Sequence, residues 1–85
     1  MARALVEIWS SVSAGERAAF LARARERQRS LQRLGVSFWV FERPDLAREM
    51  VQYVEASAPE RFEQARALIA LVPGEREILL QQLEL

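Results

Sequence analysis

Hydrophobic and polar residues alternate along the first segment of the chain. Residues 4–11 read ALVEIWSS. Successive side chains of a strand point to opposite faces, so Val6 and Ile8 would share one face while Glu7 and Trp9 would share the other. This two-residue period predicts a first strand.

A helical pattern follows the strand. Ser13 and Glu16 have the S-x-x-E spacing of a capping box, in which the two residues satisfy amides at a helix start. Apolar residues then recur every three or four positions as far as Leu34. Gly35 can adopt the left-handed conformation that ends many helices. We therefore expect a helix from Ala14 to Leu34.

A β-hairpin and a second helix are predicted next. The aromatic and β-branched segment Val36–Phe41 and the alternating segment Glu49–Ala56 favour two strands joined by a loop centred on Pro44. A second S-x-x-E spacing, Ser57–Glu60, opens a helix that Pro73 and Gly74 would end.

The last segment, Glu75–Leu85, fits two structures. Its Glu, Leu and Gln residues favour a helix, whereas the alternation of Ile78 and Leu80 favours a strand. We predict a strand, because the preceding elements leave a sheet that needs an edge partner. The resulting order, βαββαβ, is the ferredoxin-like arrangement. It predicts one α+β domain over residues 1–85, with a four-stranded antiparallel sheet and both helices on one face.

The opposite sheet face would then have no cover within the chain. On the alternation above it collects Leu5, Trp9, Trp39, Phe41, Met50, Val54, Leu79 and Leu83, with Glu7, Ser37, Gln52 and Gln81 among them. Large aromatic side chains bury roughly 150–250 Å² each, so the patch would match or exceed the roughly 300–600 Å² of a typical monomer's largest one. We expect a second copy to cover it, sheet against sheet, which makes the protein a homodimer. The predicted interface comprises Leu5, Trp39, Phe41, Met50, Val54, Leu79 and Leu83.

Composition restricts the chemistry. The sequence has no Cys, His, Asn, Thr or Lys, which excludes zinc fingers, Cys and His nucleophiles, lysine Schiff bases and P-loop lysines. We expect no metal and no cofactor. Twelve arginines balance twelve acidic residues, so no overall field favours nucleic acid or an anionic membrane. The longest apolar run, residues 67–72, is far shorter than the roughly 18 residues of a membrane span. We expect a cytoplasmic protein.

Two segments carry a resemblance to a known family. The strand and helix start ALVEIWSSVSAGERAAF, and YVEASAPERFEQA, in which a strand ends and a helix opens with Phe at its start, resemble the dimeric α+β barrel superfamily. This group includes the antibiotic-biosynthesis-monooxygenase-like and stress-responsive barrel proteins. The resemblance implies a cavity between two facing sheets, used in different members for cofactor-independent oxygenation of aromatic polyketides, haem degradation or small-ligand rearrangement. The haem-degrading members use an Asn and an axial His, and this chain has neither.

The candidate site residues lie on the uncovered face. Trp9 and Trp39, with Gln52 and Gln81, could bind a flat apolar or aromatic ligand, or could instead pack in a filled dimer interface. Three functions stay open: ligand binding between the sheets, cofactor-independent oxygenation, and a structural or regulatory dimer. Whether the protein is an enzyme is undecided.

Two ionisable residues have open roles. Glu7 could act as a general base, or could pair with an arginine such as Arg3. Tyr53 is predicted to lie beneath the helices. If the strand had the opposite phase, Tyr53 would instead be the best candidate proton donor.

Overall fold

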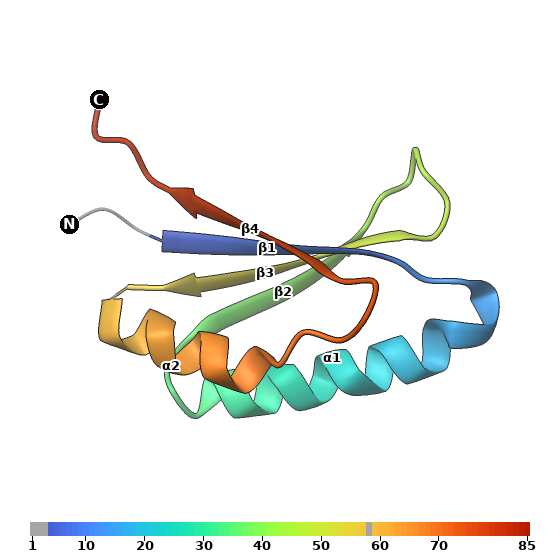
Figure 1. Ribbon diagram of the computed structural model, residues 1–85, viewed down its shortest axis with the longest axis horizontal. Helices are drawn as coiled ribbons and strands as arrows, with labels where there is room; N and C mark the ends of the chain where they lie inside the picture. The colour runs from blue at the N-terminus through green and yellow to red at the C-terminus, as the bar shows by residue number, and fades with distance from the viewer. Residues whose placement is uncertain (1–3, 58) are drawn as a thin grey trace.

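A computed structural model describes residues 4–57 and 59–85, which form two layers: a sheet, and two helices on one of its faces (Figure 1). In chain order the elements are β1 (Ala4–Ser11), a 3-10 turn η1 (Ala14–Glu16), α1 (Arg17–Gln32), β2 (Ser37–Glu42), β3 (Glu49–Ala56), α2 (Pro59–Ile69) and β4 (Arg76–Gln81). All neighbouring strands are antiparallel, in the order β2-β3-β1-β4. The predicted ferredoxin-like α+β fold is confirmed.

The first helix has the predicted signals at both ends. The Glu16 carboxylate accepts hydrogen bonds from the Ser13 backbone N–H at 3.3 Å and from the Ser13 hydroxyl at 2.6 Å. Gly35 has a φ of +70°, and the Val36 N–H donates to the Leu31 carbonyl oxygen at 3.1 Å. The α-helix itself covers only Arg17–Gln32, because its first turn is a 3-10 turn and its last residues form the turn at Gly35.

The second half of the chain differs from the prediction at two boundaries. Helix α2 ends at Ile69 rather than at Pro73, and Ala70 after it has a left-handed φ of +48°. The C-terminal strand is confirmed over Arg76–Gln81, but residues 82–85 have no regular structure. The second expected capping box contains Ala58, which lies outside the described residues.

The hydrophobic core lies between the sheet and the helices. Val6 and Ile8 of β1, Leu31 of α1 and Val54 of β3 are fully or almost fully buried there. Helix α2 contributes side chains that share a period of three or four residues, namely Phe62, Ala65 and Ile69. The core uses one face of β1, β2 and β3 and leaves the opposite face of the sheet open.

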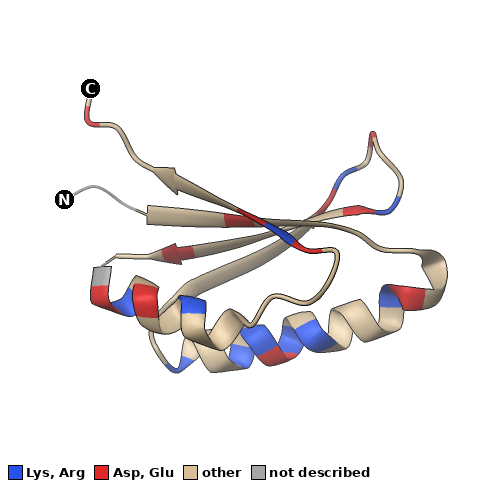
Figure 2. Ribbon diagram, in the orientation of Figure 1, with Lys and Arg blue, Asp and Glu red and all other residues tan. Residues whose placement is uncertain are grey.

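Charge is distributed unevenly between the elements. Arginines concentrate on α1 (Figure 2), and several pair with acidic side chains of the same or other elements. Arg17 pairs with Glu42 at 2.9 Å, and Arg29 pairs with Glu26. In the part of the chain that the structure describes, no helix is long and apolar enough to cross a bilayer.

Candidate functional site

The face of the sheet turned away from the helices carries the side chains that alternate with the core. Glu7 pairs with Tyr53 across β1 and β3, Trp9 pairs with Val51, and Trp39 pairs with Tyr53 across β2 and β3. Paired residues of antiparallel strands share a face. We call this surface the open face; it comprises Leu5, Glu7 and Trp9 of β1, Ser37, Trp39 and Phe41 of β2, Val51, Tyr53 and Glu55 of β3, and Arg76, Ile78 and Leu80 of β4.

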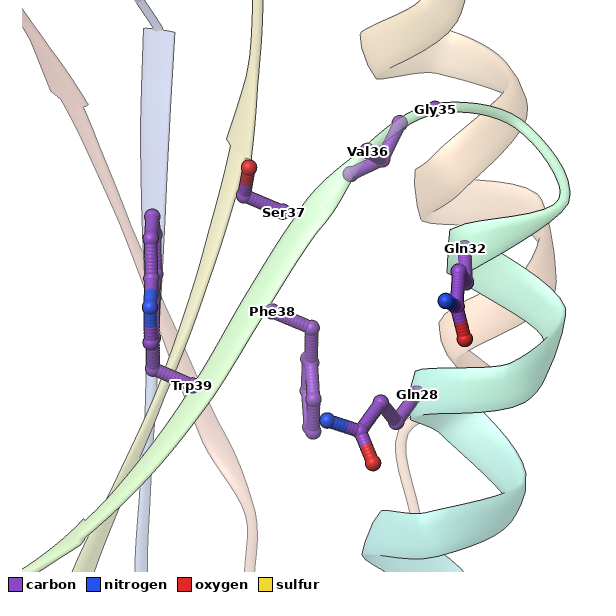
Figure 3. Close-up of a pocket in the computed structure, with 7 residues that line it drawn as sticks. All are labelled: Gln28, Gln32, Gly35, Val36, Ser37, Phe38 and Trp39. Atoms are coloured by element: carbon purple, nitrogen blue, oxygen red, sulfur yellow. The ribbon is translucent and has the colours of Figure 1, made fainter.

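Strand β2 shows the alternation directly. Phe38 points toward α1 and the side chain of Gln28, whereas Ser37 and Trp39 point away from the helix (Figure 3). A groove of about 360 Å³ runs along this edge between α1 and β2. The structure therefore places Trp39 on the open face, as the alternation predicts, and the same holds for Trp9 and Glu7 of β1.

The predicted phase of β3 is wrong by one residue. Met50, Gln52 and Val54, expected on the open face, are buried beneath the helices with exposed fractions of 3%, 0% and 0%. Val51 and Tyr53 take their place, because Tyr53 pairs with Glu7. A one-residue slip exchanges every side chain between the two faces. Tyr53 thus belongs to the candidate site, and Gln52 does not.

The predicted phase of β4 is also wrong. Leu79 pairs with the core residue Val6, and Gln81 pairs with Ala4, so both belong to the helix side. Leu83, another predicted interface residue, lies beyond the end of the strand and is largely exposed. The open face instead receives Ile78 and Leu80, whose partners on β1 are Glu7 and Leu5.

A shallow depression of about 550 Å³ lies on the open face. In the described part of the chain, its lining is mostly aromatic and aliphatic, with one cation and one carboxylate: Leu5, Trp9, Trp39, Phe41, Arg43, Val51, Tyr53 and Glu55. Phe41 and Tyr53 meet edge to face, with ring centres 5.5 Å apart and planes at 78°. A flat apolar molecule would find contact surface here on three strands.

Glu7 lies on the open face between its register partners Tyr53 of β3 and Ile78 of β4. Its Oε1 atom accepts a hydrogen bond from the Trp9 indole N–H at 3.1 Å. Burial, the negative charge of Glu7 and a hydrogen bond to Glu7 together raise the pKa of the Tyr53 phenol. The Trp9 N–H thus holds this carboxylate beside an apolar depression, with Tyr53 as its cross-strand neighbour. Arg3, the sequence-based alternative partner of Glu7, lies outside the described residues.

Arg43 closes the hairpin end of the depression. Its guanidinium carbon lies 5.7 Å from the centre of the Trp9 ring, within cation–π distance. The guanidinium also donates to both carboxylate oxygens of Asp45, at 3.1 and 2.6 Å. This pair holds the pKa of Asp45 below its usual range. Trp9 thus contacts Glu7 through its N–H and Arg43 through its ring.

A second polar cluster, beneath the helices, was missed by the sequence analysis. Arg27 on α1 donates to both carboxylate oxygens of Glu75 at 2.7 Å, and to Gln52 at 3.1 Å. Gln52 donates in turn to Glu75 at 3.1 Å. The available signal was an arginine on the inner face of α1, three residues after Ala24 and four before Leu31. Because the cluster is buried and internally satisfied, its role is structural.

Among residues 4–57 and 59–85, no group of three or more His, Cys, Asp or Glu side chains is arranged to hold a metal ion. The open face instead offers an anionic acceptor, a phenol and aromatic surfaces.

Comparison with known proteins gives matches among solved structures. No protein-family model matches the sequence, and no curated protein matches it. The structure of Rv0793 from Mycobacterium tuberculosis matches with a TM-score of 0.72 and 15% identity over 96% of each chain. A candidate antibiotic biosynthesis monooxygenase from Nitrosomonas europaea matches with a TM-score of 0.68 and 15% identity, over 95% of this chain and 90% of that one.

A third match has a described activity. SnoaB, a cofactor-independent oxygenase from Streptomyces nogalater, matches with a TM-score of 0.65 and 15% identity, over 98% of this chain and 92% of that one. The chain shares its ferredoxin-like fold with these three proteins. At 15% identity this likeness establishes the fold and leaves the function to be argued from the site.

Proposed function

We propose that the open face binds a small planar aromatic ligand and that a second copy of the chain encloses it, sheet against sheet. Trp39 and Phe41 are 44% and 54% exposed, and Ile78 and Leu80 are each 41% exposed on the same face. A contiguous apolar surface of this kind is unusual on a monomer that stays alone in water. An identical copy is a complementary cover, because a twofold axis brings the same patch of both molecules together.

The ligand's polar chemistry is inferred from Glu7. The observation that carries the proposal is a carboxylate that accepts from the Trp9 indole N–H and pairs in register with Tyr53, next to a depression of about 550 Å³ with aromatic walls. An ionised carboxylate accepts hydrogen bonds and takes up protons. A planar ring system carrying a hydroxyl group would satisfy both the aromatic walls and this acceptor.

Cofactor-independent oxygenation is the second candidate function, and the same carboxylate favours it. Glu7 would take the proton of a phenolic hydroxyl and leave an electron-rich ring system that reduces O₂. A ring CH₂ between two aromatic rings would then become a carbonyl. Both C–H bonds break, one oxygen atom enters the product and the other leaves as water. SnoaB, which shares the fold, is described as an oxygenase of this cofactor-independent class.

Tryptophan fluorescence tests ligand binding, because Trp9 and Trp39 are the only two tryptophans and both line the depression. Titration with hydroxylated naphthoquinones and polycyclic phenols should give saturable quenching that weakens in Trp9→Phe. Glu7→Gln should weaken the binding of hydroxylated compounds more than the binding of matched compounds that lack a hydroxyl. Glu63→Gln, on the exposed side of α2, is the control.

Oxygen uptake separates the two functions. Consumption of O₂ with anthrone, lost in Glu7→Gln, would support the oxygenase. Binding without uptake would leave a ligand-binding protein. No response to any planar compound, with a solidly packed interface, would favour the third candidate, a structural or regulatory dimer. The cytoplasmic location stays a prediction.

A further inference from the structure

The depression on the open face has chemically different ends. Among the described residues that line it, Arg43 is the only cation and Glu55 is the only carboxylate. The strand register orders them. Glu55 pairs with Leu5 at one end, and the Arg43 N–H donates to the Glu49 carbonyl oxygen at the other. A ligand in the depression would therefore meet a fixed polarity along the strands.

Glu7 and Trp9 lie between the two ends of the depression. They are successive residues of one face of β1, so their rows are about 7 Å apart, the rise of two strand residues. The Arg43 guanidinium reaches back over the Trp9 ring, 5.7 Å from its centre. A cation and a carboxylate acceptor therefore stand over neighbouring rows of the face, a separation that one or two fused aromatic rings span.

The present partner of Arg43 can be exchanged. Asp45 is two residues away in the hairpin loop, and the side chains of Arg43 and Asp45 are 37% and 65% exposed. Exposed ion pairs of this kind contribute little to stability, typically under about 1 kcal/mol. The planar guanidinium fork suits any carboxylate, including one carried by a ligand. Displacement of Asp45 by a ligand's carboxylate would thus cost little.

We propose that Arg43 selects ligands that carry an acidic group, so that the open face prefers hydroxylated aromatic carboxylates to neutral phenols. This inference rests on the proposed binding function and adds the ligand class. The carboxylate binds the Arg43 guanidinium, the ring lies against Trp9, and the hydroxyl donates to Glu7. The two ends then orient the ligand in one direction only.

Calorimetric titration with 6-hydroxy-2-naphthoate and 2-naphthol tests the preference. The full-length protein should bind the acid at least about tenfold more tightly, the effect of one charge-assisted hydrogen bond. Arg43→Gln should make the two affinities equal. Asp45→Asn should tighten binding of the acid, because it removes the competing carboxylate. Arg48→Gln removes the same charge from the same loop without touching the depression, and should keep the preference.

The other outcomes of the titrations separate this inference from the proposed function. Equal affinities in the unmodified protein, or a preference that survives Arg43→Gln, would overturn this inference while naphthol binding still supports the proposed function. Binding of neither compound would reject both.

Discussion

Arg27 and Glu75 form a bidentate ion pair inside the protein, with both oxygen–nitrogen distances at 2.7 Å. Their side chains are 5% and 1% exposed. Arg27 also donates to the carbonyl oxygens of Ile69 and Ala70, and Glu75 accepts from the Val72 N–H at 3.0 Å. The pair therefore connects α1 to the end of α2 and to the segment that leads into β4.

Removal of one partner should destabilise the fold strongly. Arg27→Leu leaves the Glu75 carboxylate buried without its cation, and the loss of one partner of a buried pair typically costs about 3–5 kcal/mol. Arg66→Leu breaks an exposed pair with Glu77 and should cost under about 1 kcal/mol. Urea unfolding measures the free energy of unfolding of both variants. Equal effects of the two variants would contradict a central role for the buried pair.

The same pair predicts acid sensitivity. Although burial opposes it, hydrogen bonds from Arg27 and from the Val72 N–H lower the pKa of Glu75 from 4.5 to about 2. The folded pKa lies below the unfolded one, so the stabilisation is full above pH 4.5 and is lost as the pH falls toward 2. The loss is on the order of 3 kcal/mol. Carboxyl NMR shifts should show Glu75 titrating below the other glutamates; a midpoint near 4.5 would refute this.

The open face should hold two copies together. Trp39→Glu places a charge in the proposed interface and should dissociate or unfold the dimer, because a desolvated charge without a partner is costly. Leu68 is 46% exposed on α2, close to the 44% of Trp39, so Leu68→Glu is the matched control and should remain dimeric. Light scattering measures the oligomeric state of both variants. A folded monomer of the unmodified protein at micromolar concentration would disprove the dimer.

Deletion of residues 76–85, which removes β4, should abolish cooperative folding. Strand β4 pairs with β1 from Arg76 to Gln81, and its loss would expose the core residues Val6 and Ile8 along that edge. Its Ile78 and Leu80 side chains are partly exposed, so the loss comes largely from the ladder and the uncovered core. Deletion of residues 82–85, which lie outside the strand, should change the melting temperature little. Thermal unfolding followed by circular dichroism compares the two truncations; a cooperative melt without residues 76–85 would contradict the prediction.

Element order was predictable from the sequence because the signals are local. The Ser13 capping box, the glycine at 35 and the Pro44 loop each mark a boundary without reference to distant residues. The face on which each side chain lies was predicted correctly only for β1 and β2. In β1 the polar Glu7 between Val6 and Ile8 marks the open face. In β2 both faces are apolar, and alternation predicts only that Trp39 and Phe41 share one face, which the register confirms.

The phase of β3 could not be read from its own residues. Met50 and Val54 would suit either a core or an interface, and Gln52 between them indicates a solvated face. Gln52 is nevertheless fully buried, because Arg27 and Glu75, which lie 25 and 23 residues away, satisfy its amide. Only the tertiary partners make that position a core position. Tyr53 joined the candidate site for the same reason.

Tyr53 provides a direct measurement of the candidate site, because it is the only tyrosine in the chain. Burial and the neighbouring Glu7 carboxylate raise the pKa of its phenol above the ordinary value of 10. Glu7→Gln removes the negative charge and should lower this pKa, whereas Glu63→Gln, at an exposed position on α2, should leave it unchanged. Ultraviolet absorbance of the phenolate during an alkaline titration follows the single group in each variant. Because the unfolded chain ionises first, the folded state loses stability as the pH rises above 10, so circular dichroism must confirm that the protein stays folded over the measured range. An unchanged Tyr53 pKa in Glu7→Gln would show that burial alone sets its value and that the two side chains do not act together.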